Sequence, residues 1–248
     1  MSERMSVVGA TKGGTPVQQL RLTVLGGFDL HVDDEPVRVP LAVQRMLALL
    51  AVRNRPQSRC DVASTLWMDT TQARATANLR GALWKLGPWR SELIGCDGDR
   101  MWLAPRIEVD LTQVVARARR LIGPEPGLRT DDTALEGLED ELLPGWDDEW
   151  LAAEREALHQ LRVHGLDSLC TRLVEGGRGA EAVCAGQAAV AADPLRESAQ
   201  RALIAAHLAE GNVSEAWRQY EIYRQLLWES LGLRPSPQLV SLVAVAQP

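Results

Sequence analysis

Long polar side chains recur between residues 74 and 85 at spacings that place them on one side of an α-helix. Arg74, Asn78 and Lys85 share that side, and Arg80 and Trp84 lie at its edge. Arginine pairs with guanine, asparagine pairs with adenine, and lysine more often holds a phosphate. The opposite side is apolar, with Ala75, Leu79, Ala82, Leu83 and Leu86. The spacing predicts a helix that reads the major groove of double-stranded DNA; an ordinary amphipathic helix is the alternative.

The charge of the chain is divided unevenly along its length. The whole chain has a net charge of −6, but residues 1–107 hold 14 Lys and Arg against 10 Asp and Glu, whereas residues 108–248 hold 13 against 23. A basic stripe lies within residues 40–90: Arg45, Arg53, Arg55, Arg59, Arg74, Arg80, Lys85 and Arg90. Such a local field attracts phosphates even on an acidic protein, although a solvated arginine-rich surface is the other interpretation.

The elements around this helix predict a winged helix. Alternating residues predict strands at Leu20–Leu25, Phe28–Val32 and Val37–Val39, with a turn at Asp33–Asp34. Apolar periodicity and capping residues predict helices at Leu41–Asn54 with Pro40 first, from Ser58 to Trp67 after a Ser58 cap, and at Arg74–Leu86 after a cap in Asp69–Gln72. A hairpin of Leu93–Ile94 and Arg100–Leu103 follows, joined by a type I′ turn at Asp97–Gly98. Arg100 on this wing is expected to contact the DNA backbone.

The second half of the chain predicts only helices, with an internal repeat. Leu173–Gly176 recurs as Leu208–Gly211, and Glu181-Ala182 recurs as Glu215-Ala216, at spacings of 35 and 34 residues. This is the period of tetratricopeptide (TPR) helix pairs, in which a helix ends at the glycine and the next carries a small Ala at a close helix contact. Unrelated helical hairpins are the alternative.

Several blocks of the sequence resemble the Streptomyces antibiotic regulatory protein family of transcriptional activators. In the first half they are Leu22–Leu30, Gln44–Leu50, Leu66-Trp67 and Ala77–Leu86. The second half is similar to the bacterial transcriptional activator domain of that family, at Leu143–Trp150, Asp193–Ser198, Ala205–Asn212 and Glu229–Ser236. The resemblance spans about residues 20–243 in the family's order.

The resemblance implies a mechanism as well as a fold. It implies an OmpR-type winged helix that binds direct repeats upstream of promoters, usually as a pair of protomers that associate on DNA, and that recruits the RNA polymerase holoenzyme. Two departures stand out: the chain ends after the activator domain, without the nucleotide-binding module of larger relatives, and Gly81 occupies a place where a polar contact could stand. Weak intrinsic affinity, offset by pairing, is expected.

Signatures of enzymes, cofactors and metals are absent from the sequence. The two lysines, Lys12 and Lys85, lie outside any phosphate-binding loop, and the sequence has no Ser-hydrolase elbow and no His pair of zinc spacing. No apolar run is long enough to span a membrane, and the first twenty residues lack a signal peptide's apolar stretch. We expect a cytoplasmic, nucleoid-associated protein without catalytic activity or cofactor. Its four cysteines, Cys60, Cys96, Cys170 and Cys184, are expected to be small buried residues.

The predicted fold class is therefore mostly α with a small amount of β. Residues 1–18 are expected to be a disordered tail, residues 19–107 a winged helix-turn-helix domain, and residues 108–248 an all-helical TPR-like domain. Trp84 points away from the apolar centre of its helix, and we expect it to cover the junction with the wing or the second domain rather than DNA sugars. A protein-binding adaptor whose winged helix no longer binds DNA is the alternative function.

Overall fold

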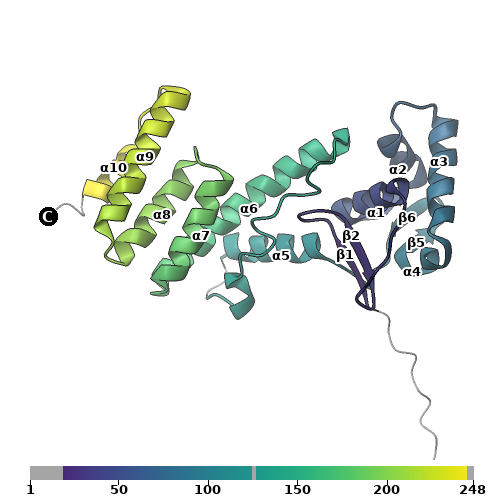
Figure 1. Ribbon diagram of the computed structural model, residues 1–248, viewed down its shortest axis with the longest axis horizontal. Helices are drawn as coiled ribbons and strands as arrows, with labels where there is room; N and C mark the ends of the chain where they lie inside the picture. The colour runs from purple at the N-terminus through teal and green to yellow at the C-terminus, as the bar shows by residue number, and fades with distance from the viewer. Residues whose placement is uncertain (1–18, 125–126, 245–248) are drawn as a thin grey trace, which may run out of the picture.

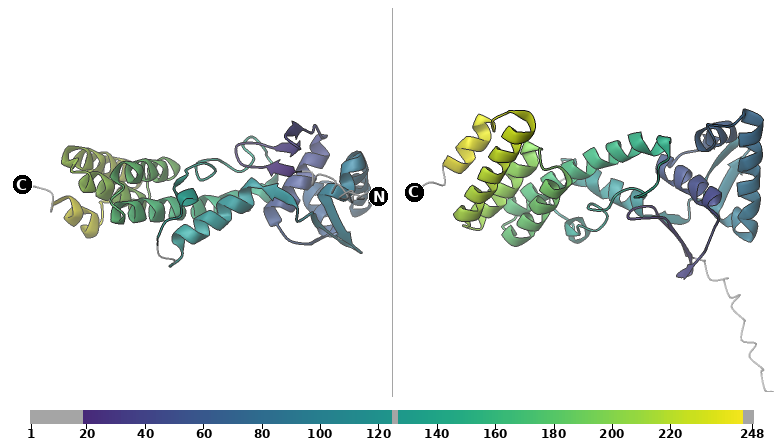
Figure 2. Two further views of the ribbon diagram at one scale, coloured as in Figure 1. Left: turned by 90° about the horizontal axis from the view of Figure 1, so that it is seen from below. Right: turned by 45° about the horizontal axis from the view of Figure 1, so that its top comes forward.

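The computed structural model describes residues 19–124 and 127–244, so the tail expected at residues 1–18 lies outside the described part of the chain. The described chain is elongated (Figure 1): small sheets and short helices form one end, and a row of helices forms the other. Two further views show the same separation, with α3 and α10 at opposite ends (Figure 2). The predicted fold class, mostly α with a small amount of β, is confirmed.

The N-terminal sheet has four strands in the order β3-β2-β1-β7. β1 (Leu20–Thr23) pairs antiparallel with β2 (Asp29–Val32) and parallel with β7 (Ile107–Val109), a return of the chain that was not expected. The third strand was predicted wrongly at Val37–Val39. It lies at Glu35–Pro36 (β3), because Asp33 and Asp34 both adopt positive φ angles of 51° and 65° and form a two-residue turn that sets Glu35 directly opposite Val32.

Three helices follow this sheet in the expected order, α1 (Leu41–Arg53), α2 (Arg59–Leu66) and α3 (Gln72–Lys85). Ser58 caps α2 as predicted, because its hydroxyl accepts from the Asp61 N–H at 3.0 Å. Two details were wrong. Pro40 lies one residue outside α1 at the N-cap, and no side chain in Asp69–Gln72 caps α3, whose N-cap is Thr71.

The wing is a three-stranded sheet in the order β4-β6-β5, comprising β4 (Gln57–Ser58), β6 (Arg100–Leu103) and β5 (Ile94–Asp97). A 3₁₀ turn (Gly87–Trp89) and the short helix α4 (Arg90–Leu93) precede it. The hairpin turn falls at Gly98–Asp99, one residue later than predicted, since Asp97 pairs with Arg100. Among the described residues of this turn only Gly98 has positive φ, which fits type II′ rather than the predicted type I′.

Residues 22–26 join the two halves of the chain. The Asp110 carboxylate accepts the N–H groups of Val24 and Leu25, at 3.0 and 2.9 Å, and that of Leu111 at 2.7 Å. On the other side of the segment, Leu142 bridges to Leu25, and the Leu143 N–H donates to the Val24 carbonyl at 2.9 Å. The predicted division at residues 107 and 108 therefore falls within β7, and a single hydrophobic core continues from Leu20 to Ala206.

The second half forms a row of helices after α5 (Asp110–Ile122) and a 3₁₀ turn (Thr130–Thr133). They are α6 (Glu149–Glu175), α7 (Gly179–Ala192), α8 (Glu197–Ala209), α9 (Val213–Leu231) and α10 (Pro237–Ala244). The predicted repeat is present in the structure. α6 ends at Glu175, next to the predicted Gly176, and α8 ends at Ala209, two residues before Gly211. Gly211 has positive φ, but in the first turn the positive φ is at Gly177, one residue after Gly176. Ala182 and Ala216 are fully buried on the following helices.

Arginines hold the connection between α5 and α6 through its backbone carbonyls. Arg155 donates to the carbonyls of Leu142 and Leu143, and Arg162, which is buried, donates to the Leu138 carbonyl at 2.6 Å. Each guanidinium carries several N–H donors in one plane. It can therefore donate to backbone carbonyls that receive no hydrogen bond within a helix or strand. The connection is thus attached to α6 along much of its length.

The prediction for the cysteines was wrong at three of the four positions. Cys60, Cys96 and Cys184 are exposed, and only Cys170 is buried. Burial raises the pKa of Cys170 to about 12, so its thiol stays protonated.

No described helix is both long enough and apolar enough to cross a membrane.

Two glycines make a matched test of helix packing. A Cβ at Gly186 in α7 would lie 2.9 Å from Leu203 Cα, whereas a Cβ at Gly81 in α3 would meet no atom within 4 Å. Gly186→Ala should therefore lower the free energy of unfolding, because overpacking costs about 1–3 kcal/mol and exceeds a gain in helix propensity of about 0.5–1 kcal/mol. Gly81→Ala should raise it by that gain alone. Urea unfolding measures the free energy of unfolding of both variants. Equal changes in that free energy for Gly186→Ala and Gly81→Ala would contradict the α7–α8 contact.

A second test concerns the Asp110 carboxylate. Asp110→Ala leaves three backbone N–H groups without their acceptor and should cost about 1–3 kcal/mol of unfolding free energy. Asp29→Ala is the control, since its exposed carboxylate accepts the neighbouring Leu30 N–H and otherwise lies 3.7 Å from His31 Nδ1, and its loss should change stability by at most about 0.5 kcal/mol. Similar urea midpoints for the two variants would mean that Asp110 does not hold residues 22–26.

Candidate nucleic-acid interface

The inner face of α3 fixes the helix against the body of the winged helix. Ala75, Leu79, Ala82, Leu83 and Leu86 are all at most 2% exposed, as the spacing predicted. This packing fixes the rotation of α3 about its own axis, because turning the helix would expose five apolar side chains. The residues on its outer face therefore have defined directions.

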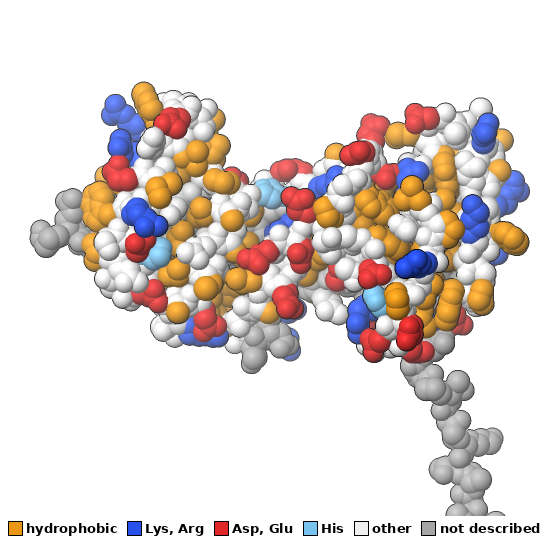
Figure 3. All heavy atoms as spheres, in the orientation of Figure 1, with side chains coloured by type: hydrophobic (Ala, Val, Ile, Leu, Met, Phe, Trp, Pro, Cys, Tyr) orange, Lys and Arg blue, Asp and Glu red, His pale blue; other side chains and the backbone are white. Residues whose placement is uncertain are grey.

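The outer face of α3 is cationic, and its polar side chains are unpaired in the part of the chain that the structure describes. Arg74, Arg80 and Lys85 are exposed, and Asn78 is partly exposed. Within the described ranges, none of these side chains forms a hydrogen bond or an ion pair with another residue, unlike most arginines of the helical half. In the space-filling view, basic side chains follow the edge of the molecule along which α3 runs (Figure 3). Unpaired cations on a rigid helix suit an anionic ligand.

Trp84 lies on the same outer face and is 80% exposed. The expectation that it covers the junction with the wing or the second domain was wrong. Trp84 follows Leu83, which faces the core, by one residue and is therefore turned outward, and none of the described elements packs over it. An indole this exposed offers a flat apolar surface with one N–H donor to a partner molecule.

Arg100 lies at the start of β6, beside the turn of the wing. Ser58 pairs with Arg100 across the sheet, and the Arg59 N–H donates to the Asp99 carbonyl at 2.9 Å. The ring of Trp102 lies over Gly95, where a Cβ would be only 2.3 Å from the indole nitrogen. The wing is thus joined to the start of α2, and Arg100 is exposed at its tip.

The basic stripe predicted for residues 40–90 is not one surface. Arg45 turns inward and, together with the Trp150 indole, donates to Asp148 Oδ1, with Arg45 Nε at 2.8 Å and Trp150 Nε1 at 3.2 Å. Asp148 is the N-cap residue of α6, so this contact ties α1 to the helical half. Arg53 donates to Gln57 and Arg59 to Cys96. Arg55, Arg74, Arg80, Lys85 and Arg90 remain without partners among the described residues.

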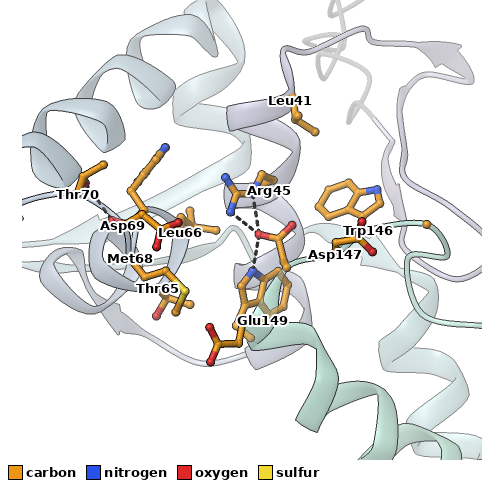
Figure 4. A pocket seen from close by; sticks show the side chains of 14 residues that line it. Leu41, Arg45, Thr65, Leu66, Met68, Asp69, Thr70, Trp146, Asp147 and Glu149 are labelled. Carbon is orange, nitrogen blue, oxygen red and sulfur yellow. Dashed lines mark hydrogen bonds and ion pairs between the residues drawn. The ribbon is translucent and has the colours of Figure 1, made fainter.

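A hollow of about 640 Å³ lies at this junction, between α1, the α2–α3 loop and the start of α6. Figure 4 shows Arg45 pointing into it, with Trp146 and Asp147 on the side of α6 and Asp69 and Thr70 on the side of the loop. Nothing in the sequence pattern marked the Arg45 and Asp148 pair, which joins residues more than one hundred positions apart.

Among the described residues, no group of His, Cys, Asp and Glu has a metal-binding arrangement.

Comparison with known proteins supports the resemblance stated above. A family model described as the bacterial transcriptional activator domain matches residues 109–245. The chain is 29% identical over 240 residues to the regulatory protein AfsR of Streptomyces griseus. The match covers 90% of this chain but 24% of that protein, so the chain spans about a quarter of the length of this curated relative.

A solved structure has a similar fold. The structure of Mycobacterium tuberculosis EmbR in complex with a low affinity phosphopeptide has a TM-score of 0.70 and 22% sequence identity. The match covers 94% of this chain and 66% of that one, and therefore includes the winged helix as well as the row of helices.

The family model and the curated relative both describe regulatory proteins rather than enzymes. The family match covers more than half of the chain, and the order of the blocks agrees with the Streptomyces antibiotic regulatory protein family. A winged helix followed by this helical domain is the architecture that the resemblance implied. The chain therefore belongs to the family of bacterial transcriptional regulators that carry the bacterial transcriptional activator domain.

Proposed function

We propose that the chain binds double-stranded DNA, with α3 in the major groove and the wing on the neighbouring backbone. The observation that carries this proposal is the outer face of α3, whose cations have no partner in residues 19–124 and 127–244 and whose Trp84 is 80% exposed. A major groove about 12 Å wide accepts one α-helix, and α3 is held with its polar side outward. Membership of a transcription-regulator family supports the same reading.

Each side chain has a proposed role. Arg74 and Asn78, in the first half of α3, read base edges, while Arg80 and Lys85 hold phosphates. Trp84 lies against the sugar-phosphate backbone, and Arg100 on the wing contacts the backbone beyond the groove. Contacts to phosphate orient the protein, and contacts to bases select the sequence.

Activation is proposed to follow from pairing on DNA. Two protomers bind direct repeats upstream of a promoter and together recruit the RNA polymerase holoenzyme, as the family resemblance implies. Pairing matters because the outer face of α3 offers few long polar side chains, and Gly81 adds none. The winged helices meet head to tail, and the acidic helical half stays clear of the phosphates.

Variants of α3 test the proposed DNA surface. Arg74→Ala and Asn78→Ala should each cost about 1–3 kcal/mol on the specific site and relax base preference at one position. Lys85→Ala should weaken all sequences alike, since it removes a phosphate contact. Footprinting on a site obtained by unbiased genomic selection measures both effects. Arg218→Ala, an exposed arginine on α9, is the control and should bind as the wild type does. Unchanged affinity for all three α3 variants would move the DNA surface elsewhere.

The spacing between repeats tests pairing. Inserting about five base pairs turns the second site to the opposite side of the duplex and should abolish cooperative binding, whereas about ten should partly restore it, since a turn is about 10–10.5 base pairs. Gel-shift titrations of the three spacings give the cooperativity directly. Equal affinity at all three spacings would contradict pairing, and so would a single repeat that the chain binds as tightly as two repeats.

A further inference from the structure

A pocket lies at the end of the molecule opposite to α3, where α10 packs beside α9 (Figure 1). Gly232 ends α9 with a φ angle of 65°, and the chain then turns into α10, which begins at Pro237. The pocket has a volume of about 440 Å³ and lies between the second half of α9, this turn and α10. Its lining residues are Tyr220, Arg224, Trp228, Leu233, Arg234, Pro235 and Val240.

Much of the wall of this pocket is apolar and exposed. Trp228, Leu233 and Val240 are 58%, 55% and 45% exposed. Leu227 and Leu239, the residues directly before Trp228 and Val240, are buried in the small core of this end, so Trp228 and Val240 face outward. Single exposed apolar side chains are ordinary, but three that line one pocket indicate a place for an apolar ligand.

Tyr220 contributes a hydroxyl that lacks a partner. Its side chain lines the pocket, yet the residue is only 9% exposed, and its ring packs edge to face against Trp217 with the centroids 5.7 Å apart. The Tyr220 hydroxyl forms no hydrogen bond within residues 19–124 and 127–244. A tyrosine buried to this extent usually has a hydrogen-bond partner for its hydroxyl, so a polar ligand atom in the pocket would supply what the described chain does not.

The charged groups that line the pocket are both cations. Arg234 is exposed and has no ion pair or hydrogen bond with a described residue. Arg224 donates from Nε and Nη2 to Glu221, at 2.9 and 2.7 Å, so its Nη1 is left without an acceptor in the described part of the chain. Tyr220, Arg224 and Trp228 follow one another at intervals of four residues, which places the hydroxyl, the guanidinium and the indole along one side of α9.

The acidic residues near the pocket lie outside its lining and are already bonded. Glu221 is held by Arg224, Glu229 accepts from the Gln225 amide at 2.8 Å, and Glu197 accepts the Ser236 N–H at 2.9 Å. Counting Glu221 against Arg224, the charge of Arg234 remains unbalanced. The pocket therefore suits an anion, and a carboxylate is the anion whose two oxygens match the planar donors of a guanidinium.

We propose that this pocket binds a small molecule in which an apolar body carries a carboxylate group. The carboxylate accepts hydrogen bonds from Arg234, from Arg224 Nη1 and from the Tyr220 hydroxyl, and the apolar body lies against Trp228 and Val240. The volume falls within the range of about 300–1,000 Å³ that is usual for small-molecule sites. This function goes beyond DNA binding and does not depend on it, because the pocket and α3 share no residue.

Fluorine NMR with the full chain tests the proposal. The probe is para-fluorophenylbutyrate, and the comparison is its uncharged amide, which has nearly the same shape. We expect a saturable change of the butyrate signal and binding about tenfold tighter than that of the amide, because hydrogen bonds between two charged groups are about twice as strong as neutral ones. Failure of the butyrate to saturate, or equal binding of the two probes, would overturn the proposal.

Three variants locate the site. Arg234→Gln should weaken binding of the butyrate about five- to tenfold and leave the amide within about twofold, because it removes charge and not apolar surface. Trp228→Ala should weaken both probes alike, by about three- to tenfold, because it removes apolar surface and not charge. Arg218→Gln changes an exposed arginine of α9 outside the pocket and should bind both probes as the wild type does. Wild-type binding of the butyrate by Arg234→Gln would place the ligand elsewhere and overturn the proposal.

A second copy of the chain is the other occupant that an exposed apolar surface could have. Sedimentation of the wild type and of Trp228→Ala, without DNA or probe, separates the two possibilities. We expect the same sedimentation coefficient for both, because a small ligand needs no second protomer. A dimer of the wild type that Trp228→Ala dissociates would mean that another copy covers the pocket, and would overturn the proposal.

Discussion

The arrangement of the two halves depends on how the backbone of residues 22–26 is satisfied. β1 uses its two edges for β2 and β7, and the next residues then turn to the Asp110 carboxylate on one side and to residues 141–143 on the other. A buried N–H without an acceptor costs about 1–3 kcal/mol, so these bonds strongly favour one arrangement of three segments far apart in sequence. Arg45 and Asp148 add an ionic link from α1 to α6, and the winged helix and the row of helices therefore share one core.

This junction holds the basic surface of the winged helix apart from the acidic row of helices. The cationic face of α3 lies at one end of the elongated molecule, and the acidic half extends away from it (Figure 1). At physiological salt, charges more than about 8 Å apart are largely screened, so the acidic helices need not repel DNA held at α3. A net charge of −6 is thus compatible with a DNA-binding role, which the charge of the whole chain alone would have discouraged.

Local features could be predicted from the sequence, and long-range ones could not. The Ser58 cap, the buried face of α3 and the glycine turns of the repeat depend on residues within a few positions of each other, and the prediction of each was confirmed. The β1–β7 pairing, the bridge from Leu25 to Leu142 and the Arg45–Asp148 pair join distant segments that no periodicity links. The exposure of Trp84 and of three cysteines also depends on which elements cover them, and for these the sequence-based expectations failed.

The central claim is that unpartnered cations of α3 and the wing bind the phosphates of double-stranded DNA. The most direct measurement is the affinity of the intact chain for a selected duplex as a function of salt concentration. Each neutralised phosphate contributes about −0.9 to the slope of log K against log salt, so the phosphate contacts of Arg80, Lys85 and Arg100 predict a slope of about −3 for each bound protomer. A slope near zero, or no binding at low salt, would contradict the account.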